Sequence, residues 1–138
     1  MPVVYGKAEM IHKGSEIALV AVGSMVETAC EVRKILKEKG LDVTVVNERF
    51  IKPIDAGMIH KLSFDHKLIV TMEENVGLGG FGDTVCQYAD DSQLDVKVLN
   101  IALPDDYVEH GNVSILKKEE GIDAAGVADR VLSFYTNI

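Results

Sequence analysis

Residues 70–82 read Val-Thr-Met-Glu-Glu-Asn-Val-Gly-Leu-Gly-Gly-Phe-Gly, and this stretch decides the fold. The β-branched apolar run 68–72 that leads into it is typical of a buried strand. Glu73 and Glu74 follow the run, then a turn rich in glycine, and then residues typical of a helix. A strand, a turn and a helix in this order predict an α/β fold. Both glutamates would then lie at the carboxyl end of a strand, where open α/β sheets form their binding crevices.

Strands and helices are predicted to alternate along the rest of the chain. Two apolar runs, 17–22 and 41–47, enclose a stretch with helical spacing that starts after Ser24 and ends at Gly40. Such a unit implies parallel strands joined by a right-handed crossover. The remaining predicted elements are, in chain order, a short helix capped by Asp55, a helix over 83–89, a strand over 94–102 and a helix capped by Asp123 that ends near Tyr135.

The first residues predict a strand of the opposite direction. Residues 7–12 have the pattern of a half-exposed edge strand, and only residues 13–15 separate them from the next apolar run. A turn this short permits only an antiparallel connection or a hop across the sheet, because parallel neighbours need a crossover of about a dozen residues. The sheet is therefore expected to be mixed. We expect one domain over residues 1–138. Its fold class is a three-layer α/β/α domain with a mixed, mostly parallel sheet of about five strands.

Composition narrows the range of partners. The chain has 138 residues, 47% of them hydrophobic, and a formal net charge of -8. This acidity argues against nucleic acid, because affinity for phosphate backbones comes from Lys and Arg. The chain lacks an apolar run of the roughly 20 residues that span a bilayer, and its first residues lack the layout of a signal peptide. We expect a cytoplasmic protein with no membrane partner. Its two cysteines and four histidines lack the close spacing of a metal site.

The two glycine turns lack parts of the known phosphate-binding motifs. Glu48 lies about as far after Gly23 as the ribose-binding acid of a dinucleotide fold, but that turn has one glycine where the fingerprint needs three. The glycines at 77, 79, 80 and 82 form a looser cradle without the Lys-Ser/Thr of a P-loop. Glu73 and Glu74 beside it would repel a phosphate unless a metal intervened. Both sites are disfavoured.

Several motifs together resemble the C-terminal domain of the 1-deoxy-D-xylulose-5-phosphate synthase family, a branch of the transketolase-like enzymes. They are Glu73-Glu74-Asn75, Gly79-Gly80-Phe81-Gly82, Arg49-Phe-Ile-Lys-Pro-Ile-Asp55 and Leu103-Pro-Asp-Asp-Tyr-Val-Glu-His-Gly111. The acidic and glycine-rich motifs are shared by the wider group, whereas the ending Pro104-Asp105-x-Tyr107-x-x-His110-Gly111 narrows the resemblance to the synthase. Tyr107 stands where that family more often has Phe. The resemblance covers about residues 3–133.

The resemblance implies an enzyme of which this chain is one part. The family condenses pyruvate with glyceraldehyde 3-phosphate, with loss of carbon dioxide, for isoprenoid, thiamine and pyridoxal synthesis. Two other domains hold thiamine diphosphate: one through a metal at a Gly-Asp-Gly…Asn motif, one through a glutamate. The pair Gly82-Asp83 continues to Thr84, so the metal motif is missing here. The resemblance implies an accessory, dimer-supporting domain that is inactive alone. Thiamine diphosphate and Mg²⁺ would belong to its partners, the cofactor-binding domains of a homodimer.

No catalytic, cofactor-binding or metal-binding residue is assigned to this chain. The candidate interface or turn residues are Glu73, Glu74, Asn75, Gly79, Gly80, Gly82, Asp105 and His110. Acids before a helix N-terminus are favoured structurally, and the glycines predict positive φ or close backbone packing. A docking role also predicts an exposed apolar patch. Two alternatives stay open: a separately encoded C-terminal subunit of a transketolase or 2-oxo acid dehydrogenase, and a free-standing regulatory module that binds a small anion or nucleotide.

Overall fold

The computed structural model describes residues 8–23, 25–48, 55–73, 81–102 and 124–137. Its strands are β1 (Glu9–His12), β2 (Glu16–Ala21), β3 (Thr44–Asn47), β4 (His66–Glu73) and β5 (Lys97–Ala102). Its helices are α1 (Met25–Glu38), α2 (Ala56–Asp65), α3 (Phe81–Asp91) and α5 (Ala124–Thr136).

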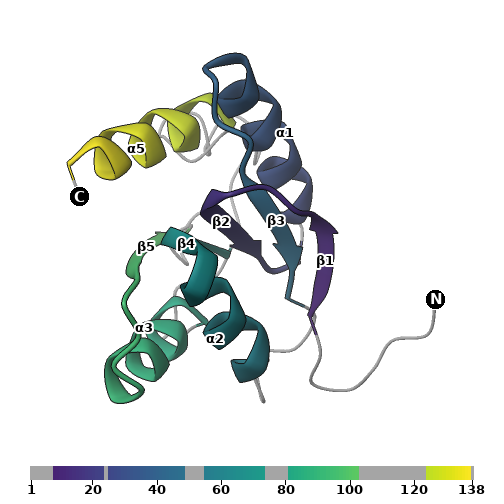
Figure 1. The fold of residues 1–138 in the computed structure, drawn as a ribbon. Helices are drawn as coiled ribbons and strands as arrows, with labels where there is room; N and C mark the ends of the chain where they lie inside the picture. The colour runs from purple at the N-terminus through teal and green to yellow at the C-terminus, as the bar shows by residue number, and fades with distance from the viewer. Residues whose placement is uncertain (1–7, 24, 49–54, 74–80, 103–123, 138) are drawn as a thin grey trace.

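The strands form one sheet in the order β1-β3-β2-β4-β5. Strands β2 to β5 are parallel to their neighbours, whereas β1 pairs with β3 in the antiparallel direction at the edge. Helices α1 and α5 cover one face of the sheet, and α2 and α3 cover the other (Figure 1). The predicted three-layer fold with a mixed, mostly parallel sheet of five strands is confirmed.

The central strand β2 supplies both halves of the core. Its side chains alternate between the faces: Leu19 packs into the layer under α1 and α5, and Val20 into the layer under α2 and α3. Both are buried, as a continuous apolar run in a strand covered on both faces predicts. The helices meet these layers with buried residues at helical spacing, for example Met25, Ala29 and Val32 on α1.

The observed bounds differ from the predicted ones where distant groups bind the backbone. Strand β3 begins at Thr44 rather than residue 41, because the carbonyl of Asp42 accepts from the N–H of Ser15 at 2.8 Å and so closes the turn before β2. Strand β5 begins at Lys97 rather than residue 94, because the N–H of Leu94 donates to Ala89 at 2.9 Å and closes the end of α3.

Two helix ends follow the sequence signals. The end of α1 at Gly40 is confirmed: that residue has φ +91°, and the N–H of Leu41 donates to the carbonyl of Leu36 at 2.9 Å. The predicted cap of α2 is also confirmed, since the Asp55 side chain accepts from the N–H of Met58. Ser24 and Asp123, the predicted caps of the other two helices, lie outside the described residues.

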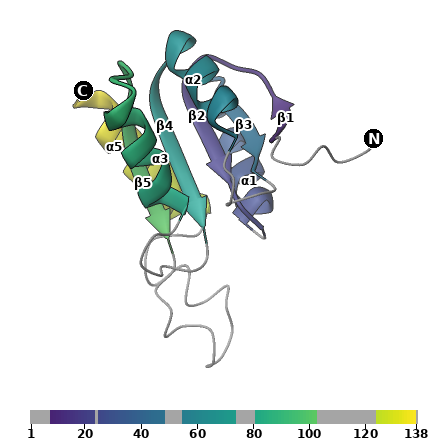
Figure 2. The same cartoon turned by 90° about the horizontal axis from the view of Figure 1, so that it is seen from below.

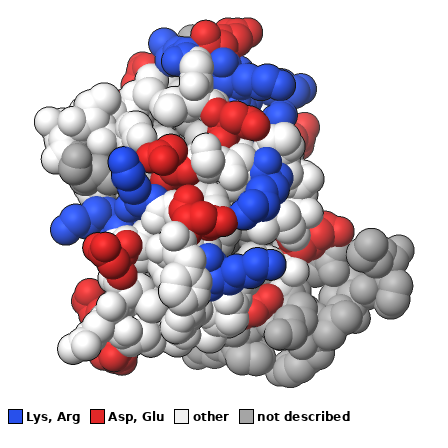
Figure 3. Space-filling model, viewed as in Figure 1, with Lys and Arg blue, Asp and Glu red and all other residues white. Residues whose placement is uncertain are grey.

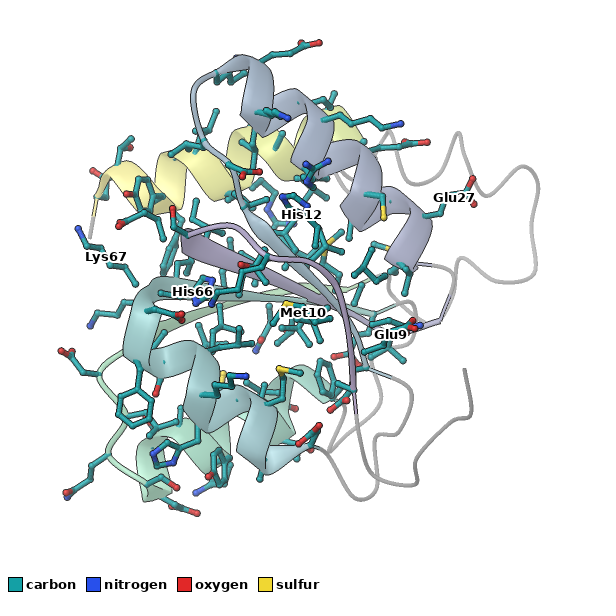
Figure 4. The ribbon with its side chains drawn as sticks, turned by 45° about the vertical axis from the view of Figure 1, so that its right-hand side comes forward. Glu9, Met10, His12, Glu27, His66 and Lys67 are labelled. Atoms are coloured by element: carbon teal, nitrogen blue, oxygen red, sulfur yellow. The ribbon has the colours of Figure 1, made fainter. Side chains whose placement is uncertain are left out.

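Linked buried polar groups lie at the amino ends of the parallel strands, called the amino edge below. The Thr44 Oγ1 accepts from the N–H of Gly14 at 2.8 Å and lies 2.7 Å from Nε2 of His66. His66 begins β4 beside α2 (Figure 4), and its Nδ1 faces the carbonyl of Leu62 at 3.0 Å and Asp65 Oδ1 at 2.6 Å. Because both neighbours of Nδ1 only accept, that nitrogen carries a proton. The amino edge is therefore used to join β3, β4 and α2.

Helix α3 packs on the sheet through Gly82. A Cβ atom at this position would lie 2.7 Å from Cγ of Asn100 and 3.0 Å from Oγ1 of Thr71. Among the described glycines, positive φ occurs at Gly23 and Gly40. Close backbone packing, not positive φ, is therefore what requires glycine at position 82.

We predict opposite effects of alanine at two of the helical glycines, Gly82 and Gly57. Gly82→Ala should lower the free energy of unfolding by about 1–2 kcal/mol, because Asn100 has to turn away. That movement breaks the 2.6 Å bond from the buried Thr71 hydroxyl to Asn100 Oδ1. Gly57→Ala is the matched control: its Cβ would meet Asp55 Oδ1 at an ordinary 3.5 Å. It should stabilise by about 0.4–1 kcal/mol. Urea unfolding measures both, and equal effects would contradict the packing argument.

Candidate functional site

The candidate site is the side of the sheet at which the four parallel strands end, called the carboxyl edge below. After β2 the chain turns into α1 on one face, and after the adjacent strand β4 it turns into α3 on the other face (Figure 2). Such a switch point is where open α/β sheets form binding crevices. The pairing of β2 with β4 continues one residue past β2, since the N–H of Val22 donates to the carbonyl of Met72 at 2.9 Å.

Glu73 lies at this switch point and binds the start of α3. Its side chain is buried, and Oε1 accepts from the N–H of Phe81 at 3.2 Å while Oε2 accepts from the N–H of Gly82 at 2.6 Å. The first N–H groups of a helix lack partners within the helix, so a carboxylate there supplies both a charge and two acceptors. This contact explains why α3 begins at Phe81, two residues before the predicted start.

Two other helices that start at this edge, α1 and α2, also have protein partners for N–H groups of their first turns. At α1, the N–H of Met25 donates to the carbonyl of Val22 at 3.3 Å, and the N–H of Val26 to that of Gly23 at 3.2 Å. At α2, the N–H of Met58 donates to Asp55 Oδ1 at 3.0 Å. An anion at a helix N-terminus uses such N–H groups. Their occupation by the chain's own oxygens disfavours a phosphate or dinucleotide site on the described part of this edge.

Glu48, directly after β3, is a further acid of this edge, which sequence reasoning considered only for a dinucleotide site. It is 1% exposed, and its Oε1 accepts from the N–H of Asp55 at 2.9 Å. Its Oε2 has no hydrogen-bond partner among the described residues. Burial raises the pKa of Glu48 to about 7, and the nearby Asp55 charge acts in the same direction. The sequence signal for its burial was its position two residues after Val46. Side chains two residues apart in a strand point to the same face of the sheet, so Glu48 follows the buried Val46.

The structure describes two of the eight candidate residues. It places Glu73 and Gly82 together, through the bond between the Glu73 carboxylate and the N–H of Gly82. The others lie outside the described residues, in the segments that join β4 to α3 and β5 to α5: Glu74, Asn75, Gly79, Gly80, Asp105 and His110.

The surface gives little sign of the predicted apolar patch. Within the described residues, the large hydrophobic side chains that are exposed are Ile11 on β1 and Phe64 on α2, which are 43% and 79% exposed. On the face in Figure 3, acidic and basic side chains are interspersed. Across the described part of the chain, no group of His, Cys, Asp and Glu could hold a metal ion, and no helix is long and apolar enough to cross a membrane.

Comparison with known sequences identifies close relatives. The chain is 48% identical over 130 residues to 1-deoxy-D-xylulose-5-phosphate synthase of Lachnoclostridium phytofermentans, covering 94% of this chain and 21% of that protein. It is 43% identical over 134 residues to the enzyme of the same name from Dehalococcoides mccartyi, covering 96% of this chain and 21% of that protein. The chain thus spans about a fifth of the length of these relatives.

Comparison with solved structures and family models agrees with this. A split-gene transketolase, described as an inactive beta4 tetramer, superposes with TM-score 0.85 and 26% identity over 99% of this chain and 43% of that one. The 2-oxoglutarate:ferredoxin oxidoreductase of Magnetococcus marinus shares the fold, with TM-score 0.58 and 14% identity over 94% of this chain and 19% of that one. The model of the transketolase C-terminal domain matches residues 6–127. The chain therefore belongs to the transketolase C-terminal domain family, as its motifs predicted.

Proposed function

We propose that this chain acts as the accessory C-terminal domain of a cytoplasmic 1-deoxy-D-xylulose-5-phosphate synthase. In this proposal it docks on the thiamine-diphosphate-binding domains and supports the homodimer of an enzyme that condenses pyruvate with glyceraldehyde 3-phosphate. The observation that carries the proposal is the 48% identity to a synthase over 94% of this chain, which is 21% of that relative. A chain of this size needs the remaining domains for the reaction.

We assign thiamine diphosphate and Mg²⁺ to those other domains. The described residues do not fit the cofactor: they hold no cluster of three His, Cys, Asp or Glu side chains that could bind a metal ion. The Glu73 carboxylate is also committed to the two N–H groups of α3. We therefore assign no catalytic step to this chain and expect it to be inactive in isolation.

We propose the carboxyl edge as the docking face. Glu73 and Gly82 fix the start of α3 against the sheet, and so fix both ends of the connection that carries Glu74, Asn75, Gly79 and Gly80. Asp105 and His110 belong to the connection that leaves β5 at its carboxyl end. In this proposal residues of these connections contact the cofactor-binding domains, and Glu73 fixes the start of α3 at the end of one of them.

A separately encoded transketolase subunit is the second candidate. It is favoured by the likeness to a split-gene transketolase, in which a fold like this one makes up 43% of the chain compared. The regulatory module that binds an anion or nucleotide is disfavoured, because described N–H groups at the starts of α1, α2 and α3 already donate to protein oxygens.

A domain exchange tests the proposed function. We expect the Lachnoclostridium phytofermentans synthase to keep its activity when this chain replaces its own C-terminal domain, because the two sequences are 48% identical over 130 residues. The matched control places this chain in a transketolase at the same boundary. The expected result is an active synthase chimera and a folded but inactive transketolase chimera. The reverse outcome would favour the second candidate.

Cofactor binding is the direct test of the chain alone. Calorimetry with thiamine diphosphate and Mg²⁺ should show no saturable heat, because neither the metal motif nor the glutamate for the aminopyrimidine ring can be placed on this sequence. The synthase chimera serves as the positive control. Saturable binding at one site per isolated chain would sink the accessory-domain proposal.

Replacement of Glu73 tests whether the carboxylate holds α3. Glu73→Gln puts an amide NH₂ opposite a backbone N–H, so one of the two bonds is lost and the other is no longer charge-assisted. We expect the free energy of unfolding to fall by about 2 kcal/mol. Glu27, in the first turn of α1, points away from the sheet (Figure 4). As the matched control, Glu27→Gln should change stability by about 0.5 kcal/mol or less. Urea unfolding that shows equal losses for both variants would overturn this role of Glu73.

A further inference from the structure

Glu48 supports a second carboxylate that ties two parts of the chain together. Its Oε1 accepts from the N–H of Asp55 at 2.9 Å. The two side-chain oxygens of Asp55 accept from different segments: Oδ1 from the N–H of Met58 at 3.0 Å, and Oδ2 from the N–H of Ala8 at 2.8 Å. Asp55 thus joins the first turn of α2 to the residue before β1, and Glu48 holds the backbone of Asp55.

The second oxygen of Glu48 is in an unfavourable position for a charge. Oε2 is buried and has no partner among the described residues. A buried carboxylate without hydrogen bonds to both oxygens is costly, and binding a proton removes most of that cost. This is why burial raises the pKa of Glu48 to about 7, although the N–H of Asp55 acts in the opposite direction.

The described groups around Glu48 add negative charge or none. At the N-cap of α2, the charge of Asp55 also raises the pKa of Glu48. On β1, Glu9 lies opposite Asn47 while the next residue, Met10, packs in the layer under α2 and α3. Successive side chains of a strand point to opposite faces, so Glu9 lies on the other face from Glu48. The backbone N–H of Glu48 donates to the apolar end of β2, at Ala21.

We propose that Glu48 is a proton-operated latch, which holds residue 8 against the start of α2 when protonated and releases it when ionised. With the proton bound, Asp55 carries the local charge alone and keeps both of its N–H donors. When Glu48 ionises, two carboxylates share one poorly solvated site. The bond from Ala8 is the contact that gives way, because Ala8 is half-buried at the beginning of an edge strand, whereas Met58 is held within α2. Its opening lets water reach both acids.

The tests below use this 138-residue chain alone, so they can fail without bearing on the proposed function.

An NMR titration tests the latch. The side-chain carboxyl carbon of Glu48 should titrate with a midpoint of about 7, and the amide proton of Ala8 should follow the same midpoint. Between pH 6 and pH 8, the protection factor of the Ala8 amide, corrected for intrinsic exchange, should fall about tenfold. Met58 provides the internal control, since its amide should keep its protection.

Two variants complete the test. Glu48→Gln keeps the acceptor for the N–H of Asp55 but cannot ionise, so its Ala8 amide should stay protected across the range. Glu38→Gln, at an exposed acid of α1, should behave as the wild type.

The melting temperature gives a second measurement. The folded pKa of Glu48 lies above its unfolded value near 4.5. The stability that the bound proton gives to the folded chain is therefore complete below 4.5 and is lost as pH rises through 7. The wild-type melting temperature should fall as pH rises from 4.5 through 7, and that of Glu48→Gln should not. A Glu48 midpoint near 4.5, or an Ala8 amide that ignores the titration, would overturn the proposal.

Discussion

The bond between the Glu73 carboxylate and the first two N–H groups of α3 is the contact on which the carboxyl edge depends. It joins the last residue of β4 to Phe81 and Gly82, and so seats α3 where the backbone of Gly82 lies directly against Thr71 and Asn100. A Cβ atom at position 82 would overlap the Asn100 side chain. The carboxylate bonds bring the start of α3 close to the sheet, and the lack of a side chain at position 82 leaves room for that approach.

The same solution recurs at α2, where Asp55 caps the helix and Glu48 holds Asp55. In both cases an acid follows or faces a parallel strand and accepts from backbone N–H groups at the start of the next helix. These are the groups that α/β proteins with phosphate ligands leave open. Here carboxylate oxygens of the chain itself accept from these N–H groups at α2 and α3. This suits a domain whose proposed task is to present a well-fixed surface to neighbouring domains.

Local patterns in the sequence were sufficient for the strands and helices whose signals are local. The apolar run of β2, the helical stripe of α1 and its end at Gly40 were all predicted, because alternation, spacing and glycine each act within a few residues. The start of α3 was misplaced because it depends on Glu73, eight residues earlier. The start of β5 was misplaced because Leu94 turns back to close α3. The burial of Glu48 was not predicted, because it depends on the packing of α2 over the sheet, which no short window contains.

Glu48 and Glu73 show how the number of donors decides what one residue type can do. Both glutamates are buried at the same edge, directly after or at the end of parallel strands. Glu73 meets two N–H groups, one for each oxygen. Glu48 meets one, and its other oxygen is without a partner among the described residues. A buried oxygen without a donor makes the charged form of a carboxyl group costly and favours the proton. One missing donor therefore separates a helix cap with both oxygens bound from a carboxyl group whose pKa is raised by burial.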